Sequence, residues 1–99
     1  MSLRLDHIGI AVRDLEAARK QLEGILGTAA SPVEEVPGEG VRVSFFELDG
    51  CRIELLEPMS EDSPIEKFLA SGRSGVHHVS LAADGEGLAP LLELSLIHI

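Results

Sequence analysis

Two stretches of this sequence, one near each end, share a single strand pattern. The first is residues 6–12 (DHIGIAV) and the second is residues 77–83 (HHVSLAA). Aligned on His7 and His78, both follow the order His, apolar, small, apolar, Ala, apolar. A pattern that recurs at an offset much longer than a solenoid period indicates two related modules within one fold.

The alternation of side chains along these stretches separates small residues from bulky ones. Because successive strand residues point to opposite faces, each histidine is expected to share its face with small residues only. The small residues on the two histidine faces are Gly9, Ala11, Ser80 and Ala82. A face that carries a histidine and little bulk is typical of a pocket wall, whereas a core face carries volume.

Glu54 lies at the centre of residues 52–56 (RIELL), a stretch otherwise suited to burial. A buried carboxylate is costly unless it is paired or bound to a metal. Two imidazoles and a carboxylate on neighbouring strands form a plausible site for a divalent metal ion. The candidate metal ligands are therefore His7, Glu54 and His78.

Each of these signals also has a plainer structural interpretation. A single strand histidine is more often a hydrogen-bonded structural residue than a ligand, and Glu54 can face solvent or pair with Arg52 or Arg42. His77 is expected to face away from His78, and so to lie on the surface. The repeat makes the joint interpretation stronger than any one residue does.

The remaining patterns predict an α+β fold with a mostly antiparallel sheet covered by helices on one face. Asp14 and Ser63 suit helix N-caps, and Asp49 with Gly50 suits a tight hairpin turn. Strands are expected at residues 3–12, 31–35, 41–48, 51–57 and 76–83, and helices at residues 15–26, 64–71 and 88–94.

Length and charge limit the function. The 99 residues are 44% hydrophobic, which suits one small globular domain. Seventeen acidic residues against eight basic ones give a formal charge of −9, which argues against nucleic acid and against anionic membranes. Cys51 is the single cysteine, so no intrachain disulfide forms. With no apolar run of about 18 residues, we expect a cytoplasmic protein that binds neither nucleic acid nor membrane.

The sequence resembles the vicinal-oxygen-chelate superfamily, which includes glyoxalase I, extradiol dioxygenases and bleomycin-resistance proteins. Within it, the sequence is most similar to the methylmalonyl-CoA epimerases. The strand ELLxP of residues 54–58, followed by DSPIxxFL of residues 62–69, is the specific part of the resemblance. The stretches that carry the resemblance are residues 5–12, 40–43, 52–58, 62–69 and 75–79.

The resemblance implies a glyoxalase-like βαβββ module, repeated, whose curved sheet surrounds a divalent metal ion. Residues 1–74 would form the first module. Residues 75–99 would form an incomplete, C-terminally truncated second copy, with a strand, a short helix and an atypical tail. The family's two histidines and its Glu or Gln match His7, His78 and Glu54.

The implied reaction is a metal-dependent α-proton transfer on an acyl-CoA thioester. A cobalt-like ion would chelate methylmalonyl-CoA and stabilise an enolate while a base moves the proton. The fourth ligand, a Glu that also serves as base, is expected beyond residue 99, and Glu93 does not match it. Val43 stands where some members have a second base. No catalytic residue is therefore assigned, and we expect weak metal binding and little or no epimerisation.

Two alternatives stay open. One is a glyoxalase I-like lyase, which would need a glutathione site. The other is a non-catalytic ligand-binding module of the bleomycin-resistance type. In each case the uncovered strand edges of an incomplete module invite pairing, so we expect a homodimer.

Overall fold

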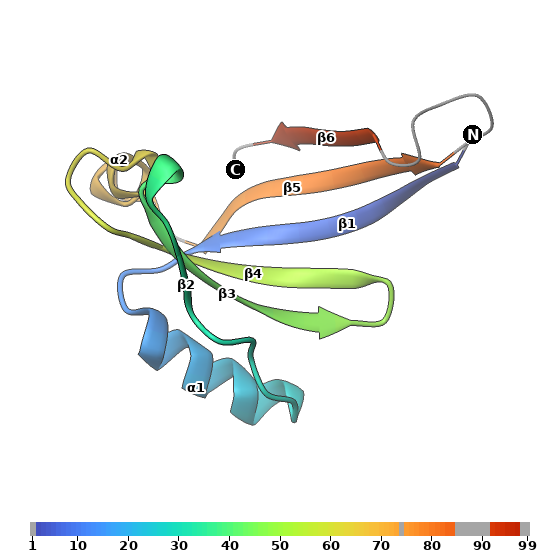
Figure 1. The fold of residues 1–99 in the computed structure, drawn as a ribbon, viewed down its shortest axis with the longest axis horizontal. Helices are drawn as coiled ribbons and strands as arrows, with labels where there is room; N and C mark the ends of the chain where they lie inside the picture. Colours follow the sequence, from blue (N-terminus) through green and yellow to red (C-terminus); the bar gives the residue numbers. More distant parts are fainter. Residues whose placement is uncertain (1, 74, 85–91, 98–99) are drawn as a thin grey trace.

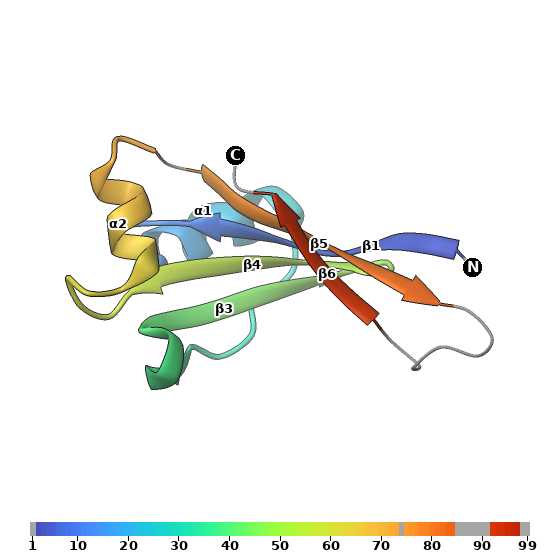
Figure 2. The same cartoon turned by 90° about the horizontal axis from the view of Figure 1, so that it is seen from above.

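The structure is a computed structural model that describes residues 2–73, 75–84 and 92–97. The described residues form two helices and six strands, and Figures 1 and 2 show their arrangement from two sides. In chain order they are β1 (Ser2–Ala11), α1 (Leu15–Leu26), β2 (Glu34–Val36), β3 (Val41–Leu48), β4 (Cys51–Pro58), α2 (Pro64–Ala70), β5 (Gly75–Asp84) and β6 (Leu92–Ile97). A single 3-10 turn, Pro37–Glu39, joins β2 to β3.

All six strands belong to one sheet, in the order β2-β3-β4-β1-β5-β6. β1 and β4 are parallel, and the other four neighbouring pairs are antiparallel. The first part of the chain runs in the order β1, α1, β2, β3, β4. The predicted α+β class and the mostly antiparallel sheet are therefore confirmed.

The two helices cover opposite faces of the sheet, whereas the sequence analysis expected one covered face. Leu55 packs with Phe46 and Leu15 beneath α1, while the next residue, Leu56, packs with Ile65 of α2. Successive residues of a strand point to opposite faces. α2 therefore lies across the end of the sheet on the face away from α1 (Figure 1). Its apolar side is buried there against the face that α1 leaves uncovered.

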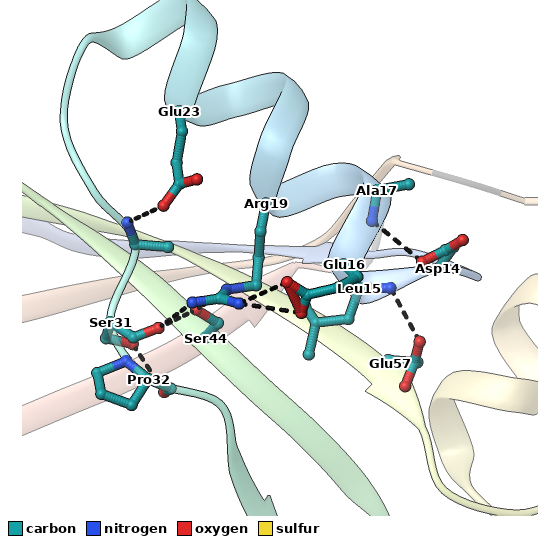
Figure 3. Close-up of polar contacts among 11 residues, drawn as sticks. Asp14, Leu15, Glu16, Ala17, Arg19, Glu23, Ser31, Pro32, Ser44 and Glu57 are labelled. Atoms are coloured by element: carbon teal, nitrogen blue, oxygen red, sulfur yellow. Dashed lines mark hydrogen bonds and ion pairs between the residues drawn. The ribbon is translucent and has the colours of Figure 1, made fainter.

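The start of α1 is fixed by two carboxylates. The Asp14 side chain accepts a hydrogen bond from the Ala17 amide at 3.0 Å, as expected of an N-cap. Glu57, at the end of β4, accepts one from the Leu15 amide at 2.8 Å. Figure 3 shows both carboxylates at the first turn of the helix. Negative charge at a helix N-terminus is stabilising, and the Glu57 contact also ties α1 to β4.

Arg19 ties the middle of α1 to β3 and to the segment before β2 (Figure 3). Its guanidinium donates to the buried Ser44 hydroxyl at 3.1 Å and to the Ser31 carbonyl at 3.1 Å. The Ser44 hydroxyl in turn donates to the same carbonyl at 2.6 Å.

The predicted strand at residues 31–35 is observed later, at Glu34–Val36. Pro32 has no amide hydrogen to donate to a strand pair.

The long antiparallel pair of β1 and β5 contains two irregularities. Leu5 pairs with Leu81 and His7 pairs with Ser80, which leaves Asp6 as an extra residue in β1. Such a bulge reverses the face on which the following side chains lie. Regular alternation along the strand expected at residues 3–12 would place Leu5 and His7 on the same face. In the structure they lie on opposite faces, so regular alternation fails at this point.

The end of the chain forms a strand where a helix was expected over residues 88–94. β6 pairs antiparallel with β5. The sequence of β6, LELSLI, alternates with a period of two, which suits a strand against a free edge better than a helix. Residues 88–91 of that expected helix lie outside the described residues.

Within the described parts of the chain, neither helix has the length and apolar character that crossing a membrane requires.

Candidate metal centre

The three predicted ligands come from three adjacent strands and lie together on the sheet. His7 is on β1, Glu54 on β4 and His78 on β5. One ligand atom from each lies within 4.8 Å of the other two. The Nε2 atoms of the two histidines are 3.2 Å apart, and Glu54 Oε1 is 3.8 Å from His7 Nε2. The structure thus brings together the three residues that the sequence analysis named as ligands, and their binding of a metal ion stays a prediction.

Gly9 makes this convergence possible. It pairs with Glu54 of β4 on one side and with His78 of β5 on the other. The imidazole of His78 lies over Gly9, so that a Cβ atom added there would be 2.1 Å from His78 Cε1. Any larger residue at this position would displace the imidazole. The sequence analysis identified Gly9 as a small residue on the histidine face, but it could not predict that the His78 imidazole lies over it.

The bulge at Asp6 fixes the orientation of His7. The two side chains meet through a 2.8 Å hydrogen bond, which His7 donates from Nδ1 to Asp6 Oδ2. This bond lowers the pKa of the Asp6 carboxyl from its ordinary value, and nearby Arg52 and Arg4 lower it further, against the effect of burial. An ionised carboxylate on Nδ1 leaves the lone pair on Nε2, facing the cluster.

His77 lies inside the site, and the expectation that it lies on the surface is wrong. Gly9 pairs with His78 and Ile10 pairs with Val76, which leaves His77 as an extra residue in β5. This second bulge places both histidines on the cavity side. His77 Nδ1 is 2.9 Å from His78 Nδ1. A bulge is set by the pairing of two distant strands, so the alternation of one strand could not reveal it.

The cluster opens into a cavity of about 640 Å³. The predicted ligands and His77 form part of its lining, and much of the rest is apolar. The apolar residues are Val36, Val41, Val43, Leu56, Pro64 and Ile65. Arg52 and Glu39 also line it, and the sequence analysis had assigned no site role to either. The arrangement combines a possible cation site with space for an organic ligand.

The donor atoms suit a divalent transition metal ion. Two neutral imidazoles and a carboxylate are ligands of Zn²⁺ and of similar ions. Val43 lines the same cavity as an apolar residue. Among the described residues that line it, the carboxylates are Glu39 and Glu54.

Comparisons with known proteins identify the family. The pattern of the glyoxalase/bleomycin resistance protein/dioxygenase superfamily matches residues 6–93. An uncharacterised protein of Bacillus subtilis, YqjC, is 43% identical over 77 residues, which cover 78% of this chain and 55% of that protein. The ethylmalonyl-CoA/methylmalonyl-CoA epimerase of Cereibacter sphaeroides is 44% identical over 77 residues, which cover 77% of this chain and 58% of the relative.

A solved structure agrees with these relatives. A variant of the Streptomyces coelicolor methylmalonyl-CoA epimerase, bound to 2-nitronate-propionyl-CoA, has a TM-score of 0.73 and is 36% identical. The match covers 79% of this chain and 59% of that one. This chain spans about half the length of the curated relatives it matches. By the extent of the family match and by its fold, the chain belongs to the glyoxalase/bleomycin resistance protein/dioxygenase superfamily.

Proposed function

We propose that this chain carries the metal and substrate site of an epimerase that acts on methylmalonyl-CoA or a close acyl-CoA relative. The reaction would be a metal-dependent transfer of the α-proton of the thioester. The observation that carries the proposal is the cluster of His7, Glu54 and His78 at the wall of a cavity of about 640 Å³. Relatives and structural neighbours named as methylmalonyl-CoA epimerases support it.

In this proposal, His7, Glu54 and His78 hold one divalent cation. The hydrogen bond to Asp6 keeps the lone pair of His7 on Nε2, where the cation would bind. Gly9 leaves room for His78 to approach. The cation would act as a Lewis acid and stabilise the negative charge that develops on the thioester oxygen as the α-proton leaves, a contribution of several kcal/mol.

The remaining cavity residues would position the acyl group. Val41, Val43 and Ile65 offer an apolar surface that excludes water beside the cluster. Arg52 supplies positive charge in a chain of formal charge −9, which suits an anionic acyl-CoA. We assign no proton-transfer base, because Val43 cannot move a proton.

We also propose that the chain works as a homodimer and that residues 75–99 belong to a second module. The second module is supported by the correspondence between β1 and β5, which pair with each other and each carry a histidine of the cluster. The short outer strand β2 leaves an edge at which another chain can pair.

The first prediction concerns the three ligands. His7→Ala, Glu54→Ala and His78→Ala should each lower the affinity for Co²⁺ by more than the roughly 10–100-fold that the loss of an outer-shell partner costs. Isothermal titration calorimetry with Co²⁺ measures this. Glu16→Ala, which removes an exposed carboxylate of α1 on the other face of the sheet, is the control and should bind as the wild type does. Equal affinity in all variants would exclude the site.

The second prediction concerns Gly9. Gly9→Ala should weaken Co²⁺ binding about tenfold or more, because the new methyl group displaces the His78 ring from the cluster. Gly24→Ala is the matched control, since nothing lies within 4 Å of a Cβ at that exposed helix position. It should leave binding unchanged and stabilise α1 by up to about 1 kcal/mol. Unaltered Co²⁺ affinity in Gly9→Ala would show that His78 does not need its present position.

The third prediction concerns the substrate. Methylmalonyl-CoA should bind more tightly with Co²⁺ present than with a chelator, and His78→Ala should abolish the difference. Calorimetry with methylmalonyl-CoA and with the methylglyoxal–glutathione adduct compares the two ligand classes. Preference for the glutathione adduct would favour a lyase, and tight binding that persists in the chelator would favour a non-catalytic binding module. Either result contradicts the proposal.

A further inference from the structure

We infer that His77 is a positioning residue for His78 and holds that ring as Asp6 holds His7. This inference rests on the proposed metal site. It assigns to His77 the task of accepting a hydrogen bond from His78 Nδ1, so that His78 presents its Nε2 lone pair to the cation.

The contacts of the His78 ring place its two nitrogens in different surroundings. Nε2 faces His7 Nε2 at 3.2 Å, inside the cluster, and Nδ1 faces His77 Nδ1 at 2.9 Å, outside it. The His7 ring has the same arrangement, with Nε2 in the cluster and Nδ1 on Asp6. Each of the two histidine ligands therefore has an Nδ1 partner, and in both cases the partner is the preceding residue.

Both partners reach their histidines because of a β-bulge. In a regular strand the preceding residue points to the opposite face and cannot contact the ring of the next residue from the cavity side. Asp6 is the extra residue of β1, and His77 is the extra residue of β5. The same backbone irregularity thus recurs at both histidines, which indicates that the Nδ1 contacts belong to the site.

The His77 ring is itself held in place by α2. It packs edge-to-face on Phe68, with the ring centroids 4.9 Å apart. Phe68 is buried in the core cluster that fixes α2 on the sheet. A ring fixed in this way can orient a neighbouring ligand at a small entropic cost.

The contacts between the three rings determine which nitrogen of His77 and of His78 carries the proton. Without a cation, neutral His7 donates Nδ1–H to Asp6, so its Nε2 accepts from His78 Nε2–H, and His78 Nδ1 accepts from His77 Nδ1–H. With a cation on both Nε2 atoms, the proton of His78 must be on Nδ1. His77 then accepts it and carries its own proton on Nε2. Cation binding should therefore switch the tautomers of both rings while each keeps one proton.

Two variants separate this role from a purely structural one. His77→Phe keeps the aromatic ring against Phe68 and removes the acceptor, while His77→Asn keeps an acceptor near the place of Nδ1 and removes the ring. Calorimetry with Co²⁺ should show that His77→Phe loses about 10–100-fold in affinity, whereas His77→Asn stays within about threefold of the wild type. Thermal unfolding of each variant in a chelator checks that it is folded.

Wild-type affinity in His77→Phe, or an equal loss in both variants, would overturn the inference. Long-range ¹H–¹⁵N spectra of the wild-type ring nitrogens give a second readout that is independent of activity. Adding Zn²⁺ should move the His78 proton from Nε2 to Nδ1 and the His77 proton from Nδ1 to Nε2, and an unchanged His77 tautomer would contradict the assignment.

The same experiments distinguish this inference from the proposed function. If His7→Ala binds Co²⁺ as tightly as the wild type, the metal site itself fails. The metal-free spectrum would then still test the contact between the two rings, because the His77 Nδ1–H and His78 Nε2–H forms are expected there. Loss of affinity in His7→Ala together with wild-type affinity in His77→Phe rejects only the role of His77.

Discussion

The two bulges in the β1–β5 pair decide which side chains face the cavity. Without the bulge at Asp6, that carboxylate would point to the other face and His7 would lack its Nδ1 partner. Without the bulge at His77, the same would hold for His78. Between the two bulges lies Gly9, whose missing side chain leaves the space that the His78 ring fills. The regular pairing around Gly9 brings His7, Glu54 and His78 to one face, and the two bulges add Asp6 and His77, which a regular sheet would place on the other face.

Electrostatics explains why this cluster is compatible with an acidic chain. A formal charge of −9 repels an anionic ligand at long range, and the described cavity lining also carries two carboxylates, Glu39 and Glu54, against the guanidinium of Arg52. Arg52 Nη2 lies 3.7 Å from Asp6 Oδ2, and Arg52 also lines the cavity. Asp6 stays ionised because His7 and the two arginines lower its pKa. A divalent cation in the cluster would reverse the local sign and favour an anionic thioester.

Much of the fold and the three converging residues could be predicted from the sequence. The alternating patterns, the Asp14 and Ser63 caps and the Asp49–Gly50 turn are local signals, and local backbone physics makes them reliable. The bulge at His77 and the face chosen by α2 could not be predicted, because both depend on contacts between distant segments. The strand at the end of the chain was missed for another reason: the period-two alternation of residues 92–97 is a local signal, but a helix was expected over residues 88–94 instead.

The central claim is that His7, Glu54 and His78 bind one divalent cation. X-ray absorption at the zinc K-edge of the Zn²⁺-loaded chain tests it most directly. The account predicts a first shell of nitrogen and oxygen at about 2.0–2.2 Å, together with the outer-shell scattering of two imidazoles. It would be contradicted by a shell without imidazole scattering, or by sulfur at about 2.3 Å, which would place the ion on Cys51 instead.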